Sequence, residues 1–139
     1  LKVKGEWDHK KRFYFLGTGY YSGKTIAEYA RDYGIEDLVR EERSRYPYLH
    51  VLNFLSAAYA VLVVGSTEKH YTASKTYQAI LSERPVFAIF HAESSAVNVL
   101  EQCCAADFLV KFNEDSPDSS LEGAINEKLS NLLSGNFTL

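Results

Sequence analysis

Two stretches of the chain bring hydroxyl and lysine residues together after an apolar run, and the first of them also contains glycines. The first, residues 17–25, reads Gly-Thr-Gly-Tyr-Tyr-Ser-Gly-Lys-Thr. The second, residues 71–78, reads Tyr-Thr-Ala-Ser-Lys-Thr-Tyr-Gln. Each leads into a segment in which apolar residues recur at helical spacing. Free backbone N–H groups and the positive end of a helix dipole would meet the side chains there, which is chemistry suited to a phosphate.

In the second stretch, Thr72, Ser74 and Lys75 stand where a helix is expected to begin. Two hydroxyls and one ammonium group would then converge on the first free N–H groups of that helix. The alternative is an ordinary capped helix start with a surface lysine. The residues alone leave both interpretations open.

The first stretch invites a P-loop interpretation but departs from its spacing. The pattern G-x-x-x-x-G-K-[ST] requires glycine at position 18, where Thr18 stands, and the glycines fall at Gly17 and Gly19 instead. The next apolar runs also lack the terminal aspartate that holds magnesium in such enzymes. We therefore expect a turn that lets the backbone approach a ligand or that simply tightens a strand-to-helix connection.

Alternating strands and helices must position these residues. The apolar run 59–64 predicts a strand buried on both faces, a helix follows at residues 74–82, and a second buried strand is expected at 86–90. A βαβ unit of this kind crosses over with a right hand. The loop that precedes the helix then lies at the carboxyl edge of the sheet, where ligands of open α/β sheets bind.

The remaining segments continue the alternation. We expect strands at residues 12–16, 43–46 (weak) and 107–112, helices at 24–33, 47–58, 94–104 and 121–133, a turn at 35–39, and a left-handed cap at Gly34. The buried stripes of the helices are expected to include Ile26, Tyr29, Ala30, Tyr33, Leu49, Leu52, Leu55, Tyr77, Ile80, Leu81, Val97, Leu100 and Cys104. Ser119 and Glu122 have the spacing of a capping box. The predicted fold is α/β, a Rossmann-like doubly wound parallel sheet in three α/β/α layers.

Length and composition narrow the function classes. A chain of 139 residues suggests one domain, which we place at residues 13–139 after a charged linker or remnant at 1–12. The net charge of −3 argues against nucleic-acid binding, and no apolar run reaches the ~20 residues of a membrane span. The adjacent Cys103 and Cys104 predict reduced thiols in a cytoplasmic protein, with no metal site. Because the chain starts at Leu1, we expect it to be a segment of a longer protein.

The ordered set of motifs resembles the carboxyl-terminal domain of GT-B glycosyltransferases, in particular the group similar to family 4. Such domains carry an "aDvll" strand, a loop, and then "sKlfEyla..kPvla". The matching pieces here are residues 58–63, 74–81 and 84–86. Upstream, residues 15–19 resemble the strand and glycine turn of that group, and residues 34–39 resemble its "gl.d.V" turn. The resemblance covers roughly residues 13–133, in an architecture of which this domain is one half.

The resemblance implies a site for a nucleotide-diphosphate sugar. The diphosphate would lie at the helix start formed by Ser74 and Lys75. Many relatives carry a Glu-x7-Glu pair that binds the donor, and its two positions fall on His70 and Gln78, both non-acidic. Gln78 can still bond ribose hydroxyls. The other residues that the resemblance assigns to this site are Gly17, Thr18, Gly19, Thr72, Tyr46 near the base, and His91, for which a partly buried place at a strand end is the alternative.

The resemblance also implies parts that these residues do not include. An amino-terminal acceptor domain and the first strand of this domain would be absent, and the fragment alone would be inactive. The parent protein would transfer a sugar to a carbohydrate or lipid-linked acceptor without a cofactor, peripheral to a membrane if the missing domain binds one. Three alternatives stay open: a sugar-nucleotide epimerase of the same architecture, a P-loop-like nucleotide-binding domain, and a non-catalytic interaction module.

Overall fold

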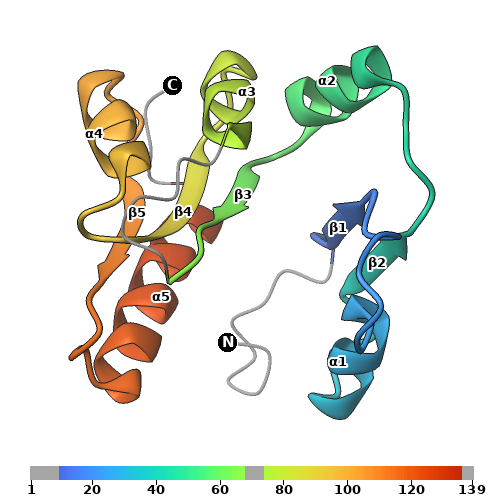
Figure 1. Ribbon diagram of the computed structural model, residues 1–139, viewed down its shortest axis with the longest axis horizontal. Helices are drawn as coiled ribbons and strands as arrows, with labels where there is room; N and C mark the ends of the chain where they lie inside the picture. The colour runs from blue at the N-terminus through green and yellow to red at the C-terminus, as the bar shows by residue number, and fades with distance from the viewer. Residues whose placement is uncertain (1–9, 68–73, 136–139) are drawn as a thin grey trace. The chain divides into compact units, whose positions relative to one another are not determined.

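The structure is a computed structural model that describes residues 10–67 and 74–135. Strands and helices alternate along the chain (Figure 1). Their bounds are β1 Phe13–Leu16, α1 Ile26–Asp32, β2 Val39–Glu42, α2 Tyr48–Ala57, β3 Val61–Val64, α3 Lys75–Leu81, β4 Val86–His91, α4 Ser95–Gln102, β5 Phe108–Phe112 and α5 Asp118–Leu133. Each strand pairing is parallel, which confirms the predicted α/β class.

The strands form two sheets rather than one ladder. One sheet contains β1 and β2, and the other has the order β3-β4-β5. The contacts of the chain likewise gather in two compact units, one within Lys2–Val51 and one within Leu52–Leu139. The single domain expected over residues 13–139 therefore stays a prediction. No helix in the described ranges is long and apolar enough to cross a membrane.

In the first unit, β1 pairs with β2 from Phe13 opposite Val39 to Leu16 opposite Glu42. The weak strand predicted at residues 43–46 was wrong, because the chain pairs four residues earlier. Only Val39 of this strand is buried, and three charged residues follow it, so that the apolar pattern of a strand is missing. The sequence signal for β2 was therefore weak where the strand actually lies.

Helix α1 is shorter than predicted and buries less. It begins at Ile26 and ends before Gly34, whose φ of +64° confirms the left-handed cap. Ala30 is its buried residue, whereas Tyr29 and Tyr33 are 46% and 77% exposed. The stripe predicted to bury these tyrosines was wrong, because a short helix on a two-stranded sheet has room to cover only one small side chain.

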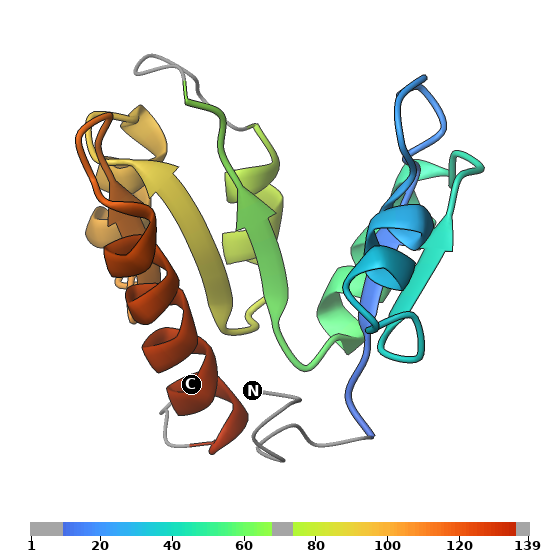
Figure 2. The same cartoon turned by 90° about the horizontal axis from the view of Figure 1, so that it is seen from below.

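The second unit has three layers (Figure 2). Helices α3 and α4 pack on one face of the sheet β3-β4-β5, around a core that includes Val63, Phe90 and Leu100. Helix α5 covers the other face, where Leu132 packs with Phe87 and Phe108. This arrangement agrees with the predicted Rossmann-like layering.

Several burial predictions for this unit were wrong. Strand β3 is not buried on both faces, because Leu62 and Val64 are 37% and 58% exposed. On α3, the buried residues are Thr76 and Ala79, while Tyr77 and Leu81 face outward. A helix that covers the edge of a three-stranded sheet contacts it through one narrow stripe, and its small residues allow the close approach.

The predictions for the remaining helices differ from the structure in smaller ways. Leu49 of α2 is exposed and Leu55 packs on the core, so the predicted stripe of that helix is only partly buried. Helix α4 ends at Gln102. Cys104 has a positive φ and lies outside this helix, so its predicted place in the buried stripe was wrong. Helix α5 begins at Asp118 after Pro117. The predicted capping box was wrong because Ser119 already lies inside the first turn of α5.

Candidate functional site

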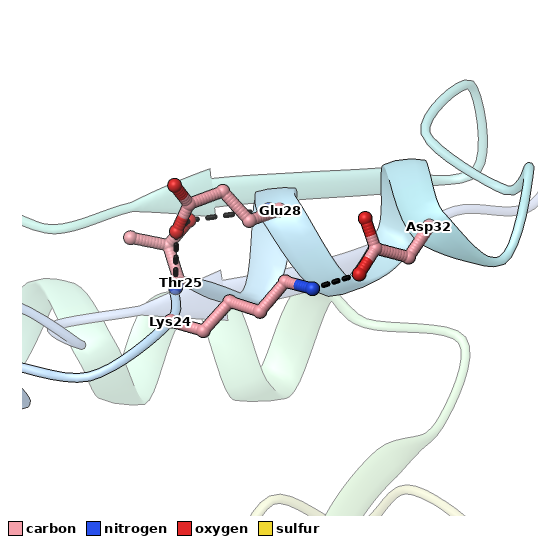
Figure 3. A network of polar contacts seen from close by, with 4 residues as sticks. All are labelled: Lys24, Thr25, Glu28 and Asp32. Atoms are coloured by element: carbon pink, nitrogen blue, oxygen red, sulfur yellow. Dashed lines mark hydrogen bonds and ion pairs between the residues drawn. The ribbon is translucent and has the colours of Figure 1, made fainter.

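The start of α1 is closed by its own side chains (Figure 3). The Thr25 hydroxyl accepts a hydrogen bond from the backbone N–H of Glu28 at 3.1 Å. In return, the Glu28 carboxylate accepts one from the backbone N–H of Thr25 at 2.7 Å. These two bonds form a capping box. The Lys24 ammonium forms an ion pair with Asp32, the last residue of α1, so it already has a partner.

Glu41 completes this closure, and sequence reasoning missed it. Its carboxylate accepts hydrogen bonds from the Thr18 hydroxyl at 2.5 Å and from the backbone N–H of Ala27 at 3.0 Å. Burial raises the pKa of Glu41, but bonds from Thr18, Ala27 and Ile26 outweigh it and hold the pKa below its ordinary value. The anion at this helix start is therefore a side chain of the protein. No sequence signal pointed to Glu41, because no strand was predicted at residues 39–42.

The glycine turn after β1 is hydrogen-bonded to the backbone at the end of β2. The backbone N–H groups of Gly17 and Gly19 donate to the carbonyls of Glu42 and Arg43 at 2.8 and 3.1 Å. A Cβ on Gly19 would lie 2.5 Å from the Arg43 carbonyl oxygen. Of the two interpretations left open by the sequence, these contacts favour the turn that tightens the connection. They also speak against a P-loop, which needs free N–H groups for phosphate.

The start of α3 is arranged differently. Ser74 stands at the cap position, but its side chain makes no capping hydrogen bond. Ser74 and Lys75 are both exposed, and the described residues offer Lys75 no ion-pair partner. The hydroxyl of Thr76, in the first turn, is buried and has no hydrogen-bond partner among the described residues. This helix start thus presents an exposed cation and one exposed hydroxyl, whereas the Thr76 hydroxyl is buried.

The strand register places this group at the carboxyl edge of the second sheet. Val64, the last residue of β3, is opposite Ile89 of β4. The chain enters α3 after the end of β3 and enters α4 after the end of β4. Because parallel strands end at one sheet edge, both helix starts lie there. At that edge Gly65 is packed so closely on the Phe90 ring that a Cβ would overlap it.

His91 and Ser94 hold the turn between β4 and α4. The His91 Nδ1 accepts a hydrogen bond from the backbone N–H of Glu93 at 3.2 Å, and its ring packs edge-on against Phe112. The Ser94 hydroxyl accepts one from the N–H of Ala96 at 3.3 Å and caps α4. His91 is only 2% exposed, which matches the buried strand-end alternative and leaves its ring little access to a ligand.

The other predicted site residues do not all belong to one compact unit. Gly17, Thr18, Gly19 and the half-buried Tyr46 belong to the unit Lys2–Val51. In the second unit, Gln78 follows Ser74 by one helical turn and is half-buried. His70 and Thr72 lie outside the described residues. The structure therefore brings together Ser74, Lys75 and Gln78 on one helix, with Thr76 as an addition that sequence reasoning missed.

A cavity of ≈ 470 Å³ lies at the opposite, amino edge of the second sheet. Residues that precede β4 and β5 line it, including Glu83, Arg84, Cys103, Cys104 and Asp107. None of the predicted site residues contributes to it. Ligands of open parallel sheets bind at the carboxyl edge, so we assign the candidate site to the start of α3.

Comparison with known proteins found no match: no protein-family model, no curated protein and no solved structure matches the chain.

Proposed function

We propose that the chain is the donor-binding domain of a GT-B glycosyltransferase and that it binds the diphosphate of a nucleotide sugar at the start of α3. The observation that carries this proposal is the exposed Lys75 beside the exposed Ser74, whose hydroxyl makes no capping bond. The buried Thr76 hydroxyl in the same turn has no partner among the described residues. An ammonium group and hydroxyls at a helix start complement a phosphate. The parallel sheet supports the proposal because the group follows β3 at the carboxyl edge, where open α/β sheets bind ligands.

These residues would bind the nucleotide sugar and stabilise the negative charge of its diphosphate. A departing nucleoside diphosphate gains negative charge as the bond to the sugar breaks. Lys75 and the N–H groups of the first turn of α3 would stabilise that charge. Gln78, one turn further along, would bond hydroxyls of the nucleotide ribose through its amide. The sugar acceptor and its domain belong to the parent protein, which would supply the second half of the cleft.

Titration calorimetry on the natural gene product that contains these residues tests this proposal. The ligands are UDP, UDP-glucose and GDP-mannose, with ATP and Mg²⁺ as the comparison. Binding of one sugar nucleotide without Mg²⁺ is the expected result. Magnesium-dependent binding of ATP alone would favour the P-loop alternative, and no binding at all would favour an interaction module. Product analysis with an added acceptor separates sugar transfer from epimerisation.

A Thr76→Val variant distinguishes a ligand contact from a structural defect. Valine has nearly the same shape but removes the unpaired hydroxyl. A buried polar group without a partner costs about 1–3 kcal/mol, so the variant should be more stable to urea. If Thr76 contacts the donor, the same variant should bind the sugar nucleotide several-fold more weakly. Unchanged affinity would remove Thr76 from the proposed site.

A further inference from the structure

The cavity at the amino edge of the second sheet contains no residue of the proposed sugar-nucleotide site. Its volume is ≈ 470 Å³, and every residue that lines it belongs to the compact unit Leu52–Leu139. The cavity is therefore defined by that unit alone. The apolar part of its wall consists of Ile80, Pro85, Val86, Ala105 and Phe108. A hollow of this size with apolar walls and a few polar groups is typical of sites for small molecules.

The two cysteines of the chain both line this cavity. Cys103 and Cys104 are exposed free thiols. Two thiolates do not complete a tetrahedral metal site, and no group of three or more His, Cys, Asp or Glu among the described residues is placed to hold a metal ion. Exchange with a small disulfide, by contrast, requires access to only one sulfur atom.

The two cysteines are poorly placed to form a disulfide with each other. Adjacent Cα atoms are ~3.8 Å apart, whereas a disulfide normally joins Cα atoms that are at least ~4.4 Å apart. Cys103 caps the end of α4, and Cys104 has a left-handed φ of +54°. A bridge would have to distort this turn. A group attached to one sulfur atom would therefore not be displaced by the neighbouring thiol.

The charges around the thiols favour a cation. Glu83 and Asp107 line the cavity and are exposed, and neither carboxylate has an ion-pair partner among the described residues. The cavity also lies at the carboxyl ends of α3 and α4, which carry partial negative charge. Arg84 is the opposing charge, and its Nε already donates to the Ser56 carbonyl at 2.7 Å. Two carboxylates and two helix ends thus outweigh one guanidinium group.

We propose that this cavity is a modification site at which Cys103 or Cys104 forms a mixed disulfide with a small aminothiol, a thiol that carries an ammonium group. The cysteine loses its proton, and its thiolate attacks one sulfur atom of the aminothiol disulfide. A new S–S bond to the protein forms as the old one breaks, and the departing thiolate takes up the proton. The cysteine sulfur is oxidised and the departing half of the disulfide is reduced. Glu83 and Asp107 bind the ammonium group of the half that stays.

Rates of disulfide exchange on the natural gene product test the proposal. The probes are cystamine, which is cationic, hydroxyethyl disulfide, which is uncharged, and dithiodiglycolate, which is anionic. Mass spectrometry follows the peptide that carries Cys103 and Cys104, and rates in urea give the intrinsic reactivity of each probe. Relative to those rates, the folded protein should favour cystamine over hydroxyethyl disulfide by at least about fivefold and should disfavour dithiodiglycolate.

The number of attached groups gives a second criterion. One group per chain is expected, because the cavity holds one and the adjacent thiol does not displace it. The same probe preference in folded and unfolded protein would overturn the proposal. Attachment of two groups, an internal disulfide between Cys103 and Cys104, or no reaction of the folded protein would do so as well.

A pair of variants measures the part played by the carboxylates. Asp107→Asn removes a carboxylate from the cavity, and Glu127→Gln removes an exposed one from α5 as the matched control. Asp107→Asn should slow the reaction with cystamine about threefold and leave that with hydroxyethyl disulfide unchanged. Neither carboxylate has a hydrogen bond or ion pair among the described residues, so we expect both variants to fold. Equal cystamine rates in the two variants would contradict recognition of the ammonium group.

Discussion

The helix start after β1 and the helix start after β3 contain similar residues, but among the described residues only the first has side chains that bond its N–H groups. At α1, Thr25, Glu28 and Glu41 take up the N–H groups, and Lys24 pairs with Asp32. At α3, Ser74 caps nothing and Lys75 is exposed without an ion pair in the described residues. The stretch richer in glycine is thus the structural one. Contacts, rather than the residue types of a motif, show that the start of α1 is a self-capped turn.

The largest effect that sharpens this comparison is expected at Gly19. A Cβ there would press on the Arg43 carbonyl oxygen, so the turn at Gly19 and the backbone at Arg43 would have to move apart. We expect Gly19→Ala to destabilise the fold by about 1–3 kcal/mol in urea unfolding. Gly123→Ala is the control, since a Cβ there meets open space and alanine favours the helix. A Gly19→Ala variant with normal stability and lost nucleotide binding would instead make this turn a ligand contact.

The second effect is expected at Lys75. Removing a charged partner of a phosphate should weaken sugar-nucleotide binding about tenfold, or ~1.4 kcal/mol, in Lys75→Ala of the natural gene product. Lys24→Ala is the matched control, because Lys24 is held by Asp32 in the other unit. Calorimetry that finds Lys24→Ala weaker and Lys75→Ala unchanged would reverse the comparison.

The sequence predicted the order of elements better than their burial. Apolar runs located β3, β4 and β5 because a buried strand must be apolar whatever its neighbours are. Exposure of Leu62, Val64 and Tyr77 depends on which element covers them, and local spacing does not carry that information. Strand β2 was misplaced because Arg40 and Glu42 interrupt its apolar pattern.

The candidate site was predictable in part for the same reason. Ser74 and Lys75 could be chosen because a hydroxyl and a lysine after an apolar strand suit a phosphate. Glu41 could not, because its partners Thr18 and Ala27 lie 23 and 14 residues away. Only the parallel pairing of β1 with β2 brings this carboxylate to the start of α1.

A smaller effect compares the two caps directly. Thr25→Ala removes a hydroxyl that accepts the N–H of Glu28, and loss of such a cap costs about 1 kcal/mol. Ser74→Ala removes a hydroxyl without a capping bond, so we expect stability within about 0.5 kcal/mol of the original protein. Chemical unfolding of both variants measures the difference. Equal losses would show that Ser74 caps α3 in solution, and α3 would then resemble α1.

The smallest effect concerns the pH dependence contributed by Glu41. Its folded-state pKa lies below the ordinary value of 4.5, so the ionised carboxylate stabilises the fold above that pH. The stabilisation is lost as the pH falls through the folded-state pKa. Glu41→Gln keeps one acceptor oxygen but cannot titrate, and its free energy of unfolding should fall less steeply below pH 4.5. Solvent screening keeps the difference small. Parallel pH profiles for the two proteins would mean that the carboxylate leaves the α1 N–H groups in solution, and the first helix start would then be open as well.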